Sequence, residues 1–296
     1  MPEGDSLHRL AAKLGPALRG RSVVRLDLPR TTLETDGATG ATVTGVEARG
    51  KNLLIHLSGG GLKSDLSIHV HLAMRGRVDL VPVGATRDPR ELVLVLETGE
   101  HAMLVRSAPI ARLVRTRDLA RDRAFRDLGP DVLGDDFDAS EAIRRMRLRN
   151  DRPLGEVLLD QGAVAGIGNV WKSELCFLEK LDPFAPTAAF TDEELGRVLD
   201  RARTMMRQTV DAPRRRRPDP FAARAFRVTR DARLGEAPLC VYDRSGQPCY
   251  ECGTPIESAA QGFSTPRITY VCPRCQPARG APISPRGPIR GPRHRE

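Results

Sequence analysis

Residues 249–275 read CYECGTPIESAAQGFSTPRITYVCPRC and are the most informative part of this sequence. It holds two Cys-x-x-Cys pairs, Cys249 with Cys252 and Cys272 with Cys275, and 19 residues separate the pairs. One such pair places two thiolates on one metal ion, and two pairs at this distance fit a tetrahedral four-cysteine zinc site on a hairpin. Four protein thiolates leave no position open for water, so we expect one structural Zn²⁺ ion.

Two other interpretations of these pairs are weaker. They are a redox dithiol and two unrelated surface pairs, but a thioredoxin-like motif needs only one pair and a βαβ context. The two remaining cysteines, Cys176 and Cys240, lack such a spacing and are interpreted as small core residues.

The net charge is concentrated around this hairpin. The 296-residue chain carries 47 Lys+Arg and 38 Asp+Glu, a net charge of +9. Residues 1–211 hold 31 of each sign, whereas residues 212–296 hold 16 Arg against 7 acidic residues, which accounts for the whole excess. A basic region beside a zinc hairpin favours a polyanionic partner, nucleic acid before a membrane surface. The alternative is a solvated Arg-rich tail.

Composition excludes several other classes of protein. Apolar runs fall short of the roughly 20 residues that a membrane helix needs, so we expect a soluble protein without a membrane partner. The N-terminus lacks the apolar core of a secretory signal, and six cysteines in a chain of this length do not imply a disulfide framework. We therefore expect the protein in the cytoplasm.

Between residue 22 and about residue 114 the sequence favours β structure. Short apolar runs recur between turn signals such as Ser58-Gly59-Gly60-Gly61, a pattern typical of a sandwich or barrel. The expected strands are residues 23–28, 53–57, 66–72, 92–96 and 103–105. Before them, apolar residues at positions 7, 10, 11, 14 and 18 predict a helix over residues 5–18.

The second half of the chain has helical patterning. A charged segment contains a short expected helix over residues 139–147, and further helices are predicted over 154–161, 170–181 and 192–209. The expected organisation is a β-sandwich domain (1–125), a linker (126–152), a helical domain (153–235), a zinc finger (236–276) and a disordered basic tail (277–296). The predicted fold class is multidomain α+β.

The start of the chain suggests chemistry. In Met1-Pro2-Glu3-Gly4, removal of Met1 leaves Pro2 with a free secondary amine. An α-amino group has a pKa of about 7.7–8.0, so a useful fraction is neutral and nucleophilic at physiological pH. Glu3 offers an adjacent acid/base. Most chains that begin Met-Pro do nothing chemical with the proline, so these residues decide little by themselves.

In context, four motifs together resemble one family. They are Met1-Pro2-Glu3-Gly4-Asp5, Arg49-Gly50-Lys51, the glycine-rich residues 162–169 and the four cysteines. Their order and spacing over residues 2–276 resemble the formamidopyrimidine-DNA glycosylase / endonuclease VIII family of base-excision repair enzymes. The Pro-Glu-Gly start is similar to the endonuclease VIII branch. The resemblance implies a β-sandwich with flanking helices, a helix–two-turn–helix domain and a zinc-finger hairpin.

The resemblance also implies a reaction and its catalytic residues. Pro2 attacks C1′ of the damaged nucleotide, the base leaves, and a Schiff base forms that undergoes β,δ-elimination. Glu3 acts as the acid/base, although a carboxylate there also suits a helix N-terminus. Lys51 matches the family's hairpin lysine, which contacts a phosphate beside the lesion.

Three further residues are implied to contact DNA. Asn169 follows a glycine-rich turn and opens a helix, where backbone N–H groups suit phosphate, although an Asn N-cap is equally common. Arg267, five residues before Cys272, matches the zinc-finger arginine that reaches phosphates. Met74 aligns with the loop that fills the hole left by the flipped base, although an isolated Met is more often a core residue.

One departure bears on the substrate. The formamidopyrimidine branch has an Asp-Pro-Arg-Arg-Phe-like loop where this chain has Arg106-Ser107-Ala108-Pro109-Ile110. We therefore expect a monomeric, nucleoid-associated bacterial glycosylase/AP lyase that acts on oxidised bases, pyrimidines first, in damaged duplex or single-stranded DNA. The alternative is a non-catalytic damaged-DNA-binding protein of the same fold. The Arg214–Arg217 run would lie in a lesion-recognition region or be solvated.

Overall fold

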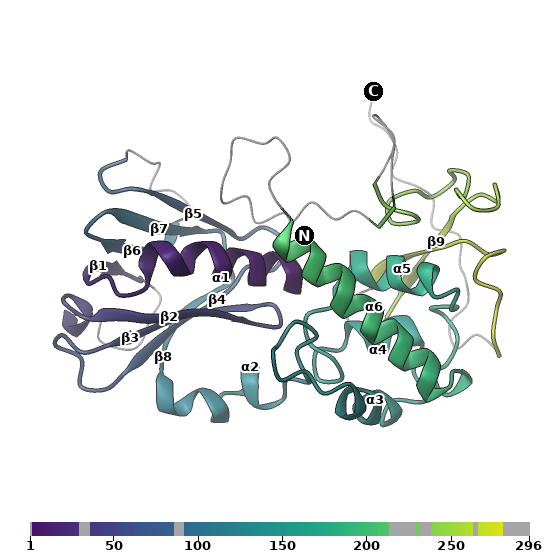
Figure 1. Cartoon of the computed structure of the whole chain (residues 1–296), viewed down its shortest axis with the longest axis horizontal. Helices are drawn as coiled ribbons and strands as arrows, with labels where there is room; N and C mark the ends of the chain where they lie inside the picture. Colours follow the sequence, from purple (N-terminus) through teal and green to yellow (C-terminus); the bar gives the residue numbers. More distant parts are fainter. Residues whose placement is uncertain are drawn as a thin grey trace. The chain divides into compact units, whose positions relative to one another are not determined.

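A computed structural model describes residues 2–29, 36–85, 92–212, 229–230, 238–262 and 266–280. The chain divides into two compact units (Figure 1). The first comprises Met1–Asp127 with Arg207–Ala225, and the second comprises Leu128–Met206 with Phe226–Glu296. The predicted Arg214–Arg217 run lies outside the described residues, and the finer five-part division stays a prediction.

Two four-stranded antiparallel sheets form the body of the first unit. One sheet has the order β2-β3-β4-β8, with β2 (Thr42–Arg49), β3 (Asn52–Ser58), β4 (Leu66–His71) and β8 (Ile110–Arg115). The other has the order β1-β6-β7-β5, with β1 (Val23–Asp27), β6 (Leu92–Thr98), β7 (His101–Arg106) and β5 (Arg77–Pro82). The predicted sandwich, and the mixed α+β class, are confirmed.

Helix α1 (Gly4–Leu18) completes the core of this unit. It begins one residue before the predicted start and buries Leu7, Leu10, Leu14 and Leu18, which recur at helical spacing. These side chains share one apolar cluster with inward-facing residues of both sheets. The helix therefore packs as an integral part of the sandwich, and its first turn is fixed by that packing.

The three strands that the sequence analysis did not single out are β2, β5 and β8. Each lies at the edge of its sheet. Edge strands have one neighbour instead of two and carry more polar side chains, so their apolar pattern is weaker than that of central strands. The charged strand β5, RVDLVP, illustrates the effect.

The outward face of the β2-β3-β4-β8 sheet is covered by the chain that follows β8. A short 3-10 helix, η2 (Thr116–Arg121), and helix α2 (Arg123–Arg126) place Leu119 and Phe125 against Leu54 and Val114 of the sheet. Polar side chains of β3, β4 and β8 are thereby enclosed beside this small apolar cluster. A further 3-10 turn, η1, spans Asp36–Ala38.

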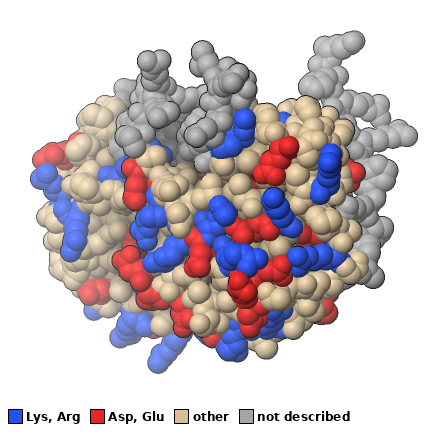
Figure 2. Space-filling model, turned by 45° about the vertical axis from the view of Figure 1, so that its right-hand side comes forward, with Lys and Arg blue, Asp and Glu red and all other residues tan. Residues whose placement is uncertain are grey.

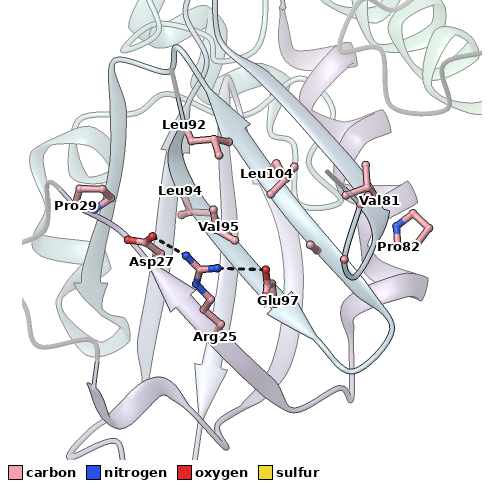
Figure 3. Close-up of a pocket in the computed structure, with 13 residues that line it drawn as sticks. Arg25, Asp27, Pro29, Val81, Pro82, Leu92, Leu94, Val95, Glu97 and Leu104 are labelled. Carbon is pink, nitrogen blue, oxygen red and sulfur yellow. Dashed lines mark hydrogen bonds and ion pairs between the residues drawn. The ribbon is translucent and has the colours of Figure 1, made fainter. Parts of the chain in front are cut away.

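The outward face of the other sheet carries a pocket of about 360 Å³ (Figure 3). Its floor is apolar, with Val81, Val95 and Leu104. At one side Arg25 lies 3.2 Å from an Asp27 oxygen and 3.7 Å from a Glu97 oxygen. This lining therefore holds one arginine between two carboxylates and has a net formal charge of −1.

Helices dominate the second unit. They are α3 (Ala139–Arg147), α4 (Leu154–Leu159), α5 (Asn169–Leu178), the 3-10 helix η3 (Thr187–Ala189) and α6 (Asp192–Asp211), whose last residues belong to the first unit. The predicted helices 139–147, 154–161, 170–181 and 192–209 are confirmed, with ends that differ by up to three residues. Asp138 caps α3 by accepting a hydrogen bond from the Glu141 N–H at 3.0 Å.

A two-stranded hairpin, β9 (Glu257–Gln261) and β10 (Arg267–Val271), packs its second strand against α5. Glu174 of α5 is fully buried and accepts hydrogen bonds from the backbone N–H groups of Cys240, Val241 and Tyr242, at 2.7, 2.8 and 2.8 Å. The Thr229 hydroxyl donates to the same carboxylate. The segment that leads into the hairpin is therefore fastened to the helix.

The first residues of the predicted disordered tail make defined contacts with the second unit. Arg279 pairs with Glu194 of α6 at 2.8 Å, and its backbone N–H donates to Asp182. Residues 281–296 lie outside the described part. On the face drawn in Figure 2, basic and acidic side chains are interspersed. Within the described residues, we find no helix long and apolar enough to cross a membrane.

Candidate active site and metal site

The predicted nucleophile and acid/base lie at the first turn of α1. Pro2 is half-buried and Glu3 has no solvent exposure. The Glu3 carbonyl accepts hydrogen bonds from the N–H groups of Ser6 and Leu7, at 3.0 and 3.2 Å. The backbone of Glu3 therefore caps the helix, and its carboxylate makes no capping bond to it. A buried carboxylate at this end also benefits from the positive end of the helix dipole.

Lys51 lies in the two-residue turn that joins β2 to β3. Arg49 pairs with Asn52 across the turn, and Gly50 has φ of 57°, the positive angle at the first central position that a type II′ turn requires. The Asn52 side-chain amide donates to the Arg49 carbonyl at 3.1 Å. The lysine is thus presented from a short, hydrogen-bonded turn.

The path of the chain brings this turn toward the first turn of α1. Gly20 and Arg21, just beyond the helix end, exchange backbone hydrogen bonds with Val43 near the start of β2. The 15-residue helix is about 22 Å long, and β2 runs back along it for a similar distance. The start of α1 and the β2–β3 turn therefore lie at the same end of the first unit (Figure 1).

Met74 lies on a tight loop after β4 and is 58% exposed. The Gly76 N–H donates to the Leu72 carbonyl at 2.8 Å, and a Cβ at Gly76 would stand 2.4 Å from that oxygen. Ala73 has φ of 48°, which is uncommon for a residue with a side chain. The loop geometry turns a large apolar side chain toward solvent, which fits a wedge and disfavours the core interpretation.

In the second unit, Asn169 begins α5 and is nearly buried. Its Nδ2 donates to the Ile268 carbonyl of β10 at 2.8 Å, and its Oδ1 accepts from the Lys172 Nζ at 2.8 Å. Because Ile268 follows Arg267, the structure brings these two predicted DNA contacts together. The Asn169 side chain has a structural role in joining helix and hairpin, which sequence reasoning did not anticipate.

The side chain of Gln161 makes three hydrogen bonds in the glycine-rich turn before α5. Gln161 donates from Nε2 to the carbonyls of Leu159 and Ile167 and accepts at Oε1 from the Gly166 N–H. Gly166 has φ of 100°, a conformation that residues with side chains rarely adopt. The turn is therefore rigid, with its backbone set at the N-terminal end of a ten-residue helix.

The four hairpin cysteines form one cluster. All four Sγ atoms lie within 4.8 Å of one another, with Cys249 and Cys275 3.9 Å apart and Cys252 and Cys272 3.5 Å apart. Four thiolates around Zn²⁺ at about 2.3 Å stand about 3.8 Å from one another in tetrahedral geometry. The donor set and its spacing fit this ion. Cys176 and Cys240 are buried elsewhere, as predicted.

A set of residues that sequence reasoning missed lies behind the Lys51 turn. Asn52, His69, His71 and Arg112 share the outward face of the sheet, since His71 pairs with Asn52 and His69 pairs with Arg112. The sequence feature that could have pointed to the two histidines is the strict alternation of apolar and polar residues over 66–71. This alternation indicates a strand with one polar face.

Known proteins match this arrangement along most of the chain. The formamidopyrimidine-DNA glycosylase N-terminal domain matches residues 1–109, and the formamidopyrimidine-DNA glycosylase H2TH domain matches residues 128–216. A probable endonuclease 8 of Streptomyces coelicolor is 36% identical over 280 residues, which cover 93% of this chain and 94% of that relative. The chain belongs to the formamidopyrimidine-DNA glycosylase / endonuclease 8 family.

Other members of the family extend the comparison. The DNA-(apurinic or apyrimidinic site) lyase Nei2 of Mycolicibacterium smegmatis is 37% identical over 279 residues, covering 94% of this chain and all of that one. Among solved structures, Lactococcus lactis Fpg in complex with DNA containing N7-benzyl-Fapy-dG has a TM-score of 0.75 at 21% identity, over 94% of this chain. That likeness shows the shared fold, and the resemblance stated from sequence is confirmed.

Proposed function

We propose that this protein is a bifunctional DNA glycosylase/AP lyase of base-excision repair. The observation that carries the proposal is the family relationship over more than nine tenths of the chain, combined with a Pro2-Glu3 start held on a buried helix turn. The related Nei2 is named as an apurinic or apyrimidinic site lyase. The alternative, a damaged-DNA-binding protein without catalysis, does not account for the lyase activity that the name of this relative states.

The proposed reaction starts at the amine of Pro2, after removal of Met1. The nitrogen attacks C1′, and the glycosidic bond breaks with its electron pair leaving on the base. Opening of the sugar ring gives an iminium on Pro2, which is permanently cationic because the amine is secondary. This electron sink makes the C2′ proton acidic, and its loss expels the 3′-phosphate. A second elimination releases the 5′-phosphate side.

Glu3 and Lys51 serve this reaction in different ways. The Glu3 carboxyl gives a proton to the ring oxygen as the ring opens and moves protons during elimination. Its complete burial keeps water away from that proton. Lys51 provides a positive charge at the phosphate beside the lesion, from a turn at the same end of the unit as Pro2.

The second unit and the Met74 loop are proposed to hold the DNA. Arg267 contacts phosphates flanking the flipped nucleotide, and the glycine-rich turn with Asn169 binds a phosphate through its backbone and amide. Met74 fills the space that the extruded base leaves. Arg267→Ala is expected to weaken binding and to lower the salt slope by about one unit, and an unchanged slope would argue against this contact.

The four cysteines are proposed to hold one structural Zn²⁺ ion. When bound, the ion cross-links the two ends of the hairpin and supplies no chemistry to the reaction. We further propose that the enzyme acts as a monomer on damaged duplex or single-stranded DNA in the bacterial nucleoid, with oxidised pyrimidines preferred. A panel of single-lesion oligonucleotides, each tested in duplex and single-stranded form, ranks these substrates.

The decisive experiment is reductive trapping. The full-length protein without Met1 is incubated with abasic-site DNA and borohydride, which reduces the iminium to a stable covalent adduct. We expect one protein–DNA adduct that mass spectrometry locates on Pro2. Binding of the same DNA with no adduct would favour the non-catalytic alternative. Pro2→Gly retains a primary amine and is therefore unsuitable as the negative control.

A further inference from the structure

A continuous chain of hydrogen bonds runs through the first unit to the turn that carries Lys51. Asp122, the N-cap of α2, accepts from Arg112 of β8 at 2.7 Å. The Nε of Arg112 donates to the Nδ1 of His69 at 3.2 Å, and the Nε2 of His69 meets the Oδ1 of Asn52 at 2.9 Å. The Nδ2 of Asn52 then donates to the Arg49 carbonyl.

Arg112 determines which atom donates and which accepts in every bond of this series. A guanidinium only donates, so the Nδ1 of His69 must accept and its Nε2 must carry the proton. The Asn52 oxygen is then the acceptor, which turns its NH2 group toward the Arg49 carbonyl. Burial, with the Arg112 charge, lowers the pKa of His69 to about 4, which keeps this single neutral tautomer at neutral pH.

A second histidine also bonds Asn52, at the end of this series of hydrogen bonds. The Nδ1 of His71 lies 3.2 Å from the same Asn52 oxygen. Burial lowers the pKa of His71, a hydrogen bond with the Lys51 backbone opposes this shift, and the Lys51 charge adds to it. The His71 ring is therefore next to Lys51 and bonded to Asn52. Asn52 is 8% exposed and uses both atoms of its amide on these partners.

We propose that Asn52 is the positioning residue for Lys51, and that His69 and His71 hold its amide so that the β2–β3 turn presents the lysine at one fixed place on the DNA. The inference rests on the proposed function, because the position of Lys51 matters only if that lysine serves the reaction. Two residues form the turn, and the Asn52 side chain donates a hydrogen bond across it to the Arg49 carbonyl. Without the amide, the long and flexible lysine moves with a looser backbone.

The first measurement compares Asn52→Ala with the wild-type protein. Single-turnover cleavage of abasic duplex DNA gives the rate constant, and fluorescence anisotropy on a tetrahydrofuran-containing duplex gives Kd. Since a displacement of about 1 Å in a positioning group can cost 100-fold, we expect the rate constant to fall between about 10-fold and 100-fold. We expect Kd to change by less than about 3-fold, because the phosphate contacts of the second unit remain.

A double-mutant cycle then separates positioning from a general loss of structure. If Asn52 acts through Lys51, Asn52→Ala added to Lys51→Ala lowers the rate constant by less than about 2-fold further. If the two losses multiply instead, Asn52 does not act through Lys51 and the proposal is overturned. Borohydride trapping of the wild-type protein is run in parallel, because failure of that reaction refutes the proposed function and not the positioning role.

Two more variants keep the result interpretable. His56→Ala removes a histidine on the same sheet face that bonds Ser67 and Glu47, away from the turn, and should cleave DNA at the wild-type rate. If Asn52→Ala does not fold, Asn52→Asp replaces it, since a carboxylate still accepts from both histidines but cannot donate to Arg49. A folded Asn52→Asp protein with wild-type cleavage would disprove the positioning role.

Discussion

Glu3 has no exposed surface, and its backbone carbonyl caps helix α1 by accepting hydrogen bonds from the N–H groups of Ser6 and Leu7. Asp5, in the same turn, is equally buried and accepts the Ser6 N–H at 2.7 Å. The proposed acid and a matched control carboxyl therefore lie in one helix turn.

Replacement of Glu3 by Gln is expected to lower base excision by about 100-fold or more, because proton transfer from a positioned acid contributes that much. The amide has nearly the same shape, so binding of abasic-analogue DNA should change by less than about 3-fold. Single-turnover excision from a lesion-containing duplex measures the effect. Asp5→Asn is the matched control and should retain wild-type excision. Equal losses in both variants would mean that the helix turn, not the acid, was disturbed.

His69 gives a pH dependence of stability. Its pKa is about 4 in the folded protein and about 6.5 in an unfolded chain. Above pH 6.5 the imidazole is therefore neutral in both states, and its titration does not affect the free energy of unfolding. As the pH falls from 6.5 to 4, the unfolded state gains a proton that the folded state lacks. The free energy of unfolding should fall by about 3 kcal/mol over this range.

Urea unfolding at pH 7 and pH 4 measures this loss, and His69→Gln isolates it. The glutamine keeps a donor near the Asn52 oxygen but does not titrate, so the variant should lose about 3 kcal/mol less than the wild type between the two pH values. Carboxylates away from His69, such as Asp160, in which the effect of burial is outweighed by hydrogen bonds from Arg149 and Arg152 that lower the pKa, act in both proteins and cancel. If the free energy of unfolding fell by the same amount in both proteins between pH 7 and pH 4, His69 would not be the source of the pH dependence.

At this scale the sequence predicted residues that belong to short motifs, such as Pro2 and the four cysteines. It did not predict Asn52, His69 and His71, since their relation depends on the register between the two strands β3 and β4 and no motif joins them. It identified Asn169 as a phosphate contact but not its bonds to Ile268 and Lys172. Lys172 lies on the next turn of the same helix, whereas Ile268 lies 99 residues away and becomes a neighbour only when the hairpin packs on α5.

Among the elements, those with strong periodicity were predicted, whereas three of the four edge strands of the sandwich, β2, β5 and β8, were not. Helix α1, helix α6 and the central strands β3 and β4 have clear apolar patterns because both of their sides, or one broad face, are buried. The edge strand β5 has one neighbouring strand and a polar pattern. Local sequence reports burial well, whereas strand pairing depends on residues far away in the chain.

The cysteine hairpin is the element whose stability should depend on metal. The purified protein should contain one zinc per chain, and removal by a strong chelator should unfold the hairpin and abolish specific DNA binding, since metal binding contributes on the order of 10 kcal/mol to such folds. Metal analysis and anisotropy measure both effects. Cys272→Ser should lose the ion, whereas Cys176→Ala, outside the cluster, should keep it. Full DNA binding without zinc would contradict the structural role.

For the whole molecule, the net charge of +9 is a poor guide to the site. Residues 1–211, which contain Pro2, Glu3, Lys51 and Asn169, are electrically neutral. Many arginines of the helical unit are paired within it, for example Arg147 with Asp192 at 2.6 Å. Figure 2 shows the resulting mixture of signs on one face. The excess therefore belongs to general attraction to DNA, while chemistry depends on a few placed groups.

Truncation after Gly280 tests this division. It removes four arginines and one glutamate, a net charge of +3. Non-specific DNA binding should become weaker and its salt slope should decrease by up to about three units, because fewer counterions are released. The single-turnover excision rate at saturating protein should stay the same. Replacing the four arginines by lysine is the control that keeps the charge, and a slower excision in the truncated protein would give the tail a catalytic role.

The carboxylate of Glu174 has a consequence for how the second unit opens. It binds three consecutive backbone amides, those of Cys240, Val241 and Tyr242, inside a core where solvent has no access. Breaking any one of these bonds leaves the buried carboxylate without one of its hydrogen-bond donors. The three amide hydrogens should therefore exchange with solvent only when the whole unit unfolds. Helix α5 and the segment that leads to the cysteines should therefore unfold together, which hydrogen exchange of these three amides measures.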